Sequence, residues 1–247
     1  LVGIPLIGLL IETLGWRSAF WLLGVLGVAG ALALAMVPAS TPGRRPPSAH
    51  IPGVGRAWSQ LLRNRHAVTL MVFAFMLSAG NDVLFVSFGV WFEDAFQLRI
   101  AALGMGAALI GVAELGGECL TALLGDRLRK KSAIIGGLIV AATACALLPL
   151  AGTSLPMALA ALFAVFLSTE FAIVISLSLT SEIIPGSRAT MMSAYFAAAG
   201  MGRVAGAILG GLVWEFGGIT LTAGISAALS LAACAGLHVG LTGDRRW

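Results

Sequence analysis

Long apolar runs dominate the chain, and short polar segments separate them. A helix needs about 20 residues to cross a hydrocarbon core of about 30 Å. The runs are continuous, whereas the strands of a membrane barrel alternate apolar and polar positions, so helices are the expected spanning elements. We predict an all-α membrane protein with one partial and about seven full transmembrane helices, over residues 1–14 (partial), 16–38, 66–92, 100–124, 132–152, 155–180, 188–214 and 218–241.

The basic residues gather in every second polar segment. Residues 39–65, 125–131, 181–188 and 242–247 would share one side of the membrane, and they hold 12 of the 15 lysines and arginines. The opposite loops hold Arg17 and Arg99. Cytoplasmic loops carry the excess of positive charge, so we expect these segments and the C-terminus to be cytoplasmic.

Composition excludes several classes of protein. The chain is 59% hydrophobic and 11% charged, against roughly 25% charged residues in soluble domains. The net charge of +4 is therefore interpreted as the positive charge of the loops that orients the protein in the membrane, and not as a sign of nucleic-acid binding. The three histidines and three cysteines form no catalytic or metal-ligand spacing, and the chain has no phosphate-binding loop. We expect no enzymatic activity, no metal and no cofactor.

The longest polar segment, 39–65, is rich in Pro, Gly and Arg and divides the chain. Its second half, GRAWSQLLRNRH, is either a short basic amphipathic helix on the inner membrane surface or part of a flexible linker. The predicted domains are 1–38, the end of a first six-helix half; 39–65, a cytoplasmic linker; and 66–247, a complete second half.

An internal repeat supports this division. Residues 3–15 (GIPLIGLLIETLG) and 206–218 (GAILGGLVWEFGG) share several residues at an offset of 203, among them the pairs Gly3/Gly206, Glu12/Glu215 and Gly15/Gly218. The copies are six helix steps apart, an even number, so both cross the membrane in the same direction, as in a parallel repeat. A twelve-helix plan follows, in which four helices and part of a fifth are expected upstream of residue 1.

Three segments carry motifs: GIPLIGLL (3–10), ALLGDRLRKKS (122–132) and SEIIPGSR (181–188). They resemble motifs of bacterial drug and sugar efflux members of the major facilitator superfamily. GIPLIGLL resembles the family's antiporter stretch, although Ile4 interrupts its Gly-Pro doublet. ALLGDRLRKKS resembles the second copy of the G-x-x-x-D-R-x-G-R-K signature, and SEIIPGSR resembles the loop between helices ten and eleven. The resemblance implies cytoplasmic gating by Asp126, Arg127, Lys130, Glu182 and Arg188 in a bacterial inner (plasma) membrane. On charge grounds we expect Glu182 to pair with Arg127 or Lys130. A solvated basic loop without a gating role is the alternative.

Five ionisable residues lie within predicted spans: Asp82, Glu114, Glu118, Glu170 and Arg203. Each costs at least about 2.5 kcal/mol at the bilayer centre, so each must face a cavity or a partner. Glu114 and Glu118 share one helix face, where two charged carboxylates repel and a bound proton relieves the repulsion. These five and Asn81 are the predicted substrate and proton sites; fixed salt bridges are the alternative.

Two other patterns have structural interpretations. Gly202, Gly206 and Gly210 form a small-xxx-small stripe that is typical of a close helix contact. Aromatic residues near span ends, such as Trp16, Trp91 and Phe92, suggest interface anchors.

These features predict a secondary active transporter that moves a small organic solute by alternating access, with proton-coupled efflux favoured. A proton-coupled or facilitative uptake permease is the alternative, and a non-transporting sensor or scaffold is a third possibility. The expected partners are the solute, protons, the bilayer and the upstream helices, in a monomer.

Overall fold

The computed structural model describes residues 7, 10, 11, 13–36, 54–98, 100–125, 127–184 and 187–242. Within them the regular structure is entirely helical, as predicted for the fold class. The helices are α2 (Trp16–Met36), α3 (Val54–Arg63), α4 (Arg65–Phe96), α5 (Ile100–Leu124), α6 (Lys130–Ala151), α7 (Leu155–Ile183) and α8 (Arg188–Gly240). Six of these, all except α3, are long and apolar enough to cross a membrane.

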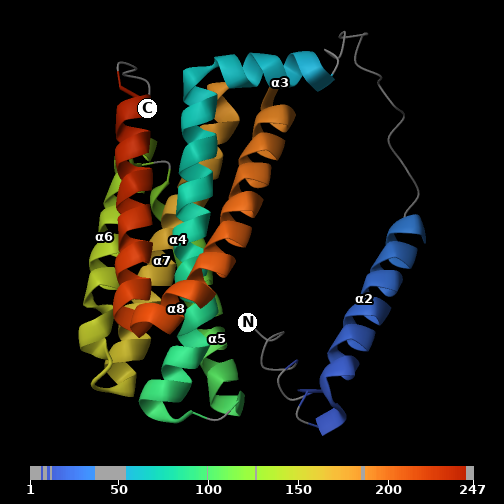
Figure 1. Cartoon of the computed structure of the whole chain (residues 1–247). Coiled ribbons are helices and arrows are strands. Elements are labelled where there is room, and N and C mark those ends of the chain that lie inside the picture. Colours follow the sequence, from blue (N-terminus) through green and yellow to red (C-terminus); the bar gives the residue numbers. More distant parts are fainter. Residues whose placement is uncertain are drawn as a thin grey trace.

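Helix α8 is two transmembrane arms rather than one helix. A straight helix of its 53 residues would be about 80 Å long, far more than a bilayer. At Gly218 the backbone leaves the helical region, with φ 51° and ψ −145°, and the ribbon turns back on itself (Figure 1). We call residues 188–217 the first arm and 219–240 the second arm. The two predicted spans 188–214 and 218–241 are therefore confirmed, and the described spans number seven.

Gly15 has the same backbone feature as Gly218. Its φ is 81°, and it directly precedes α2. A positive φ is readily adopted only by glycine, and the two glycines are paired in the predicted repeat. Residues 3–6, 8, 9 and 12 of that repeat lie outside the described residues, so the repeat and the domain division stay predictions.

The sequence left open whether residues 54–63 form a short helix or part of a flexible linker, and in the structure they form helix α3. It lies across the end of the bundle and meets α4 at a sharp corner (Figure 1). The side chain of Asn64 makes this corner by accepting hydrogen bonds from the backbone N–H groups of His66 and Ala67, the usual device at a helix start. Leu61 is buried and Trp58 packs against the same apolar cluster. The apolar face of α3 thus covers the bundle.

Helix α4 is held between the two arms of α8 by glycines. A Cβ added at Gly202 or Gly206 of the first arm would collide with the carbonyl oxygen of Phe75 or Ala79. One added at Gly210 would lie 2.8 Å from the carbonyl oxygen of Val83. The predicted glycine stripe is therefore a backbone-to-backbone helix contact.

The second arm of α8 contacts the middle of α4. A Cβ at Gly80 would lie 3.1 Å from the Cβ of Leu229, and the Ser226 hydroxyl donates a hydrogen bond of 2.7 Å to the Gly80 carbonyl. Gly80 on α4 and the glycine stripe on the first arm therefore let α4 approach both arms closely, as small residues do in membranes.

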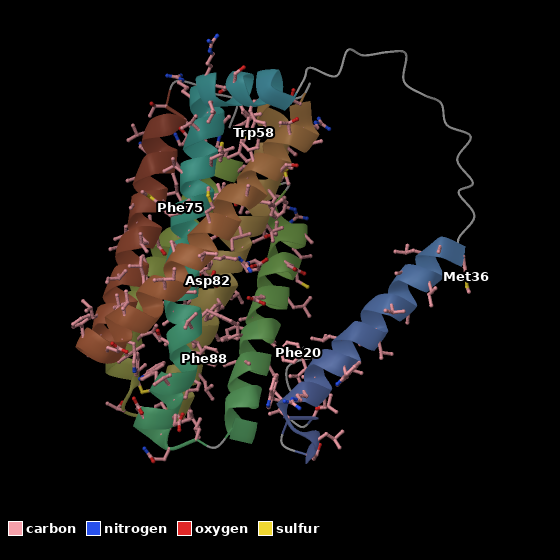
Figure 2. The ribbon with its side chains drawn as sticks, turned by 45° about the vertical axis from the view of Figure 1, so that its right-hand side comes forward. Phe20, Met36, Trp58, Phe75, Asp82 and Phe88 are labelled. Atoms are coloured by element: carbon pink, nitrogen blue, oxygen red, sulfur yellow. The ribbon has the colours of Figure 1, made fainter. Side chains whose placement is uncertain are left out.

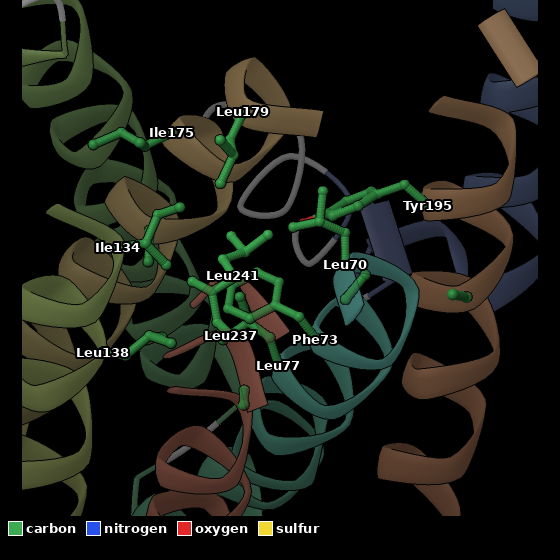
Figure 3. Close-up of a cluster of buried hydrophobic side chains, with 14 of the residues drawn as sticks. Leu70, Phe73, Leu77, Ile134, Leu138, Ile175, Leu179, Tyr195, Leu237 and Leu241 are labelled. Carbon is green, nitrogen blue, oxygen red and sulfur yellow. The ribbon is translucent and has the colours of Figure 1, made fainter. Parts of the chain in front are cut away.

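Two apolar clusters fill the bundle. One lies at the end covered by α3 and joins α4, α6, α7 and α8 through residues such as Leu70, Phe73, Leu138, Ile175 and Leu237 (Figure 3). The other lies toward Gly218 and includes Trp91 and Phe92. These two side chains are 3% and 0% exposed, so their interpretation as interface anchors is wrong: they pack inward against α5 and α7. Trp16 and Trp21, by contrast, are exposed.

Helix α2 is different from the others, because among its residues only Ala19 is buried. Its exposed apolar surface is suited to lipid or to other helices.

We predict that Gly206→Leu disrupts the α4–α8 contact. The new side chain would enter the backbone of Ala79, which cannot move aside as a flexible side chain can, so the stability loss should reach at least about 2 kcal/mol. Thermal unfolding of the purified protein in detergent measures it. Gly236→Leu is the matched control, because a Cβ there meets nothing within 4 Å; equal unfolding temperatures for the two variants would contradict the contact.

Candidate functional site

The crossing of α4 and the first arm of α8 brings Asp82 and Arg203 together. Asp82 lies about halfway along α4, where α8 crosses it (Figure 2). Its Oδ2 is 3.9 Å from Nε of Arg203. Arg203 follows Gly202 directly, and the contacts of Gly202 with Phe75 and of Gly206 with Ala79 fix both helices around the pair. The pair therefore depends on the glycine contact.

The Asp82–Arg203 pair is incompletely satisfied. The side chain of Asp82 is 17% exposed and that of Arg203 is 66% exposed. Oδ2 of Asp82 is buried and has no hydrogen-bond partner among the described residues. An arginine carries five donors, so most of its hydrogen-bonding capacity remains for water or another ligand.

Three glutamates form the other side of the charged group. Glu114 and Glu118 lie on α5 and Glu170 on α7. Glu170 interacts electrostatically with both α5 glutamates and with Arg203, and Glu114 also interacts with Arg203. The structure thus brings together all five charged residues that the sequence placed within spans, with one arginine among four carboxyl groups.

Gly117 makes this arrangement of glutamates possible. A Cβ added there would lie 2.7 Å from the carbonyl oxygen of Leu167 and 2.9 Å from the Cβ of Glu170. Helices α5 and α7 therefore touch at the turn of α5 that carries Glu114 and Glu118. Asn81, the sixth predicted site residue, is partly buried beside Asp82, and its side chain makes no hydrogen bond to a described residue.

Tyr195 is a member of this region that the sequence analysis missed. Its ring is 3% exposed, its hydroxyl is 2.6 Å from the Ser176 hydroxyl on α7, and it lies within electrostatic range of Glu170. It is the single tyrosine of the chain, and its position inside a span was the available signal. A buried tyrosine hydroxyl usually has a partner, which here joins α8 to α7 between Glu170 and the end of the bundle that α3 covers.

The predicted gating residues occupy the end of the bundle that α3 covers. Lys130, at the start of α6, forms an ion pair with Glu182, near the end of α7. The sequence allowed either Lys130 or Arg127 as the partner of Glu182, and in the structure the partner is Lys130. Arg127 and Arg188 are exposed, and Asp126 lies outside the described residues.

Other contacts show that the basic segments share this end. The ammonium group of Lys131 donates to the carbonyl oxygens of His238 and Leu241, at 3.0 and 3.1 Å. Nδ1 of His66 is 3.2 Å from the Gly240 carbonyl oxygen. Cations near the last carbonyls of a helix are stabilising, so the beginnings of α4 and α6 are tied to the end of α8.

Comparison with known families agrees with this architecture. A family model described as the Major Facilitator Superfamily matches residues 1–117 and 70–246. The chain belongs to the Major Facilitator Superfamily. Among curated proteins no sequence matches the chain.

Membership establishes the general activity of this superfamily protein. It is a multi-pass membrane protein of a secondary transporter family, and the predicted membership of the superfamily is confirmed. The charged group and the Lys130–Glu182 pair can therefore be considered as parts of a transporter.

We predict that the Asp82–Arg203 pair couples energetically. Arg203→Gln leaves the carboxylate of Asp82 without its cation and should lower stability by about 1 kcal/mol, a value reduced by the exposure of Arg203. Adding Asp82→Asn removes the uncompensated charge and should restore most of the loss. A double-mutant cycle on unfolding temperature measures the coupling.

Arg188→Gln is the control for this cycle, because Arg188 is an exposed arginine on the same helix. It should change stability by less than about 0.5 kcal/mol. A double variant no more stable than Arg203→Gln would show that the two residues do not interact.

Proposed function

We propose that this superfamily member moves a small organic solute across the membrane by alternating access, with export coupled to protons. The observation that carries the proposal is the group of four carboxyl groups and one arginine within the spans. Charges at this depth are expensive and typically mark substrate or proton pathways. Export is supported by the resemblance of residues 3–10 to the antiporter stretch.

In this mechanism the carboxyl groups bind protons and Arg203 controls their charge. Glu114, Glu118 and Glu170 repel one another when all are ionised, so a proton or a cationic group of the solute relieves the repulsion. Arg203 interacts with Asp82, Glu114 and Glu170, so its attraction can shift among them as their occupancy changes. Asn81, next to Asp82, would contribute hydrogen bonds to the solute.

The second element of the proposal is a gate at the end covered by α3. The ion pair of Lys130 with Glu182 joins α6 to α7 there, and it would close the pathway in one state and break in the other. Asp126, Arg127 and Arg188 are proposed to take part through the family motif. We place this end in the cytoplasm, with the C-terminus, because the basic segments gather there; the membrane would be the bacterial inner membrane and the protein a monomer.

The domain division also belongs to this proposal. The spans α4 to α7 and both arms of α8 would form one six-helix half, with 39–65 as linker and 1–38 as the end of the other half. The positive φ angles of both Gly15 and Gly218 support the repeat on which the division rests.

We predict that Glu114→Gln together with Glu118→Gln abolishes coupling. The intact protein is reconstituted in proteoliposomes with a pH-sensitive dye inside, and the flux of each candidate solute is measured with and without an imposed pH gradient. The gradient should accelerate flux in the parent, and the double variant should retain only the rate seen without a gradient.

Glu93→Gln is the matched control, since Glu93 is an exposed acid at the end of α4, and it should behave as the parent does. Parent flux that ignores the gradient would exclude proton coupling and favour a facilitative permease.

We predict that Lys130→Gln opens the gate. Cys119 is exposed and neighbours Glu118, so its reaction with a membrane-impermeant maleimide, added from the side of the basic loops, reports access to the charged group. In a Cys234→Ala background, Lys130→Gln should raise the labelling rate of Cys119 severalfold. The double exchange of Lys130→Glu with Glu182→Lys should reverse the rise.

Arg63→Gln is the charge-matched control for this labelling experiment. A labelling rate unaffected by Lys130→Gln would exclude the gate.

A further inference from the structure

An apolar groove lies between α5 and α6. Helices α5 and α6 both pack on α7, and the space between them is a cavity of about 470 Å³. Its walls and floor include Leu120 and Leu124 of α5, Gly136 and Val140 of α6, and Phe171 of α7, with Arg129 at its mouth.

Adjacent glycines on α6 have opposite roles in this groove. Gly137 faces α7, because a Cβ there would lie 3.1 Å from the Ser168 carbonyl oxygen. A Cβ at Gly136 would meet nothing within 4 Å. Gly137 thus sets the close packing of the floor, whereas Gly136 leaves the groove open, with no described residue against it.

The groove has the depth of one lipid leaflet. It extends along α6 from Arg129 to Val140, a distance of roughly 16 Å at 1.5 Å per residue. Half of a hydrocarbon core of about 30 Å is about 15 Å. An acyl chain of the leaflet on the side of the basic loops would therefore lie along the whole groove.

The charge at the mouth selects the head group. Arg127 and Arg129 are both exposed, and neither forms an ion pair with a described residue. Arginine binds phosphate through its planar set of donors, and basic pockets between transmembrane helices on the cytoplasmic side bind anionic lipid head groups.

We propose that this groove is a binding site for an anionic phospholipid. One acyl chain lies between α5 and α6 on Phe171, and the phosphate contacts Arg129 and Arg127. The lipid would fill the space that Gly136 leaves open and would fix residues 127–129, which directly precede Lys130 of the Lys130–Glu182 pair. The residues that line the groove include none of the five charged residues within the spans.

The test is retention of lipid by the intact protein. Protein in nanodiscs of equal parts phosphatidylglycerol and phosphatidylcholine is released into the gas phase, and retained lipids are counted by native mass spectrometry. The parent should retain phosphatidylglycerol in preference to phosphatidylcholine. Gly136→Leu should lose the retained lipid, and Arg129→Gln should keep it but with a preference reduced about fivefold.

Controls separate the groove from general effects. Gly236→Leu introduces the same side chain at another open glycine, and Arg63→Gln removes a positive charge from α3; both should match the parent. If Gly136→Leu does not fold, Val140→Trp fills the deep end from an exposed position. Retention unchanged by filling the groove would overturn the site, and equal retention of the two lipids by the parent would overturn the choice of an anionic lipid.

Discussion

The close approach of α4 to the two arms of α8 is the constraint on which the rest of this bundle depends. In a bilayer the hydrophobic effect does not distinguish a neighbouring helix from lipid, so packing and interhelical hydrogen bonds must hold the helices together. Gly202, Gly206 and Gly210 supply the packing by allowing backbone contact. Ser226 and Ser87 add hydrogen bonds to the carbonyl oxygens of Gly80 and Gly210. Without this contact, Asp82 and Arg203 would not meet.

The same principle places the glutamates. Gly117 brings α5 against α7 at the turn between Glu114 and Glu118, so Glu170 faces both. The charged residues within the spans lie beside helix contacts that the smallest residues make. Gly202 directly precedes Arg203, Gly117 directly precedes Glu118, and a Cβ at Gly117 would meet the Cβ of Glu170, so the glycines keep these charges close.

The spans and the positions of the charges could be predicted from the sequence because both depend on local composition. Seven apolar runs become seven spans, and Gly218 marks the break between two of them, as expected from a glycine that ends one span and begins the next. Contacts between distant segments could not be predicted in the same way. Glu182 forms its ion pair with Lys130 rather than with Arg127 because of where α6 begins. The burial of Trp91 and Phe92 depends on how α4 is rotated against α5. Tyr195 was missed because its hydroxyl partner, Ser176, lies on another helix.

The turn at Gly218 has a consequence for how the protein is made. No polar loop separates the two arms, and Glu215 is the single charged residue between Arg203 and His238. A translocation machinery would therefore have to move only one carboxylate, and no folded segment, past the hydrocarbon core to insert both arms. The hairpin is thus suited to enter the membrane as one unit, with its two arms already antiparallel and ready to receive α4 between them.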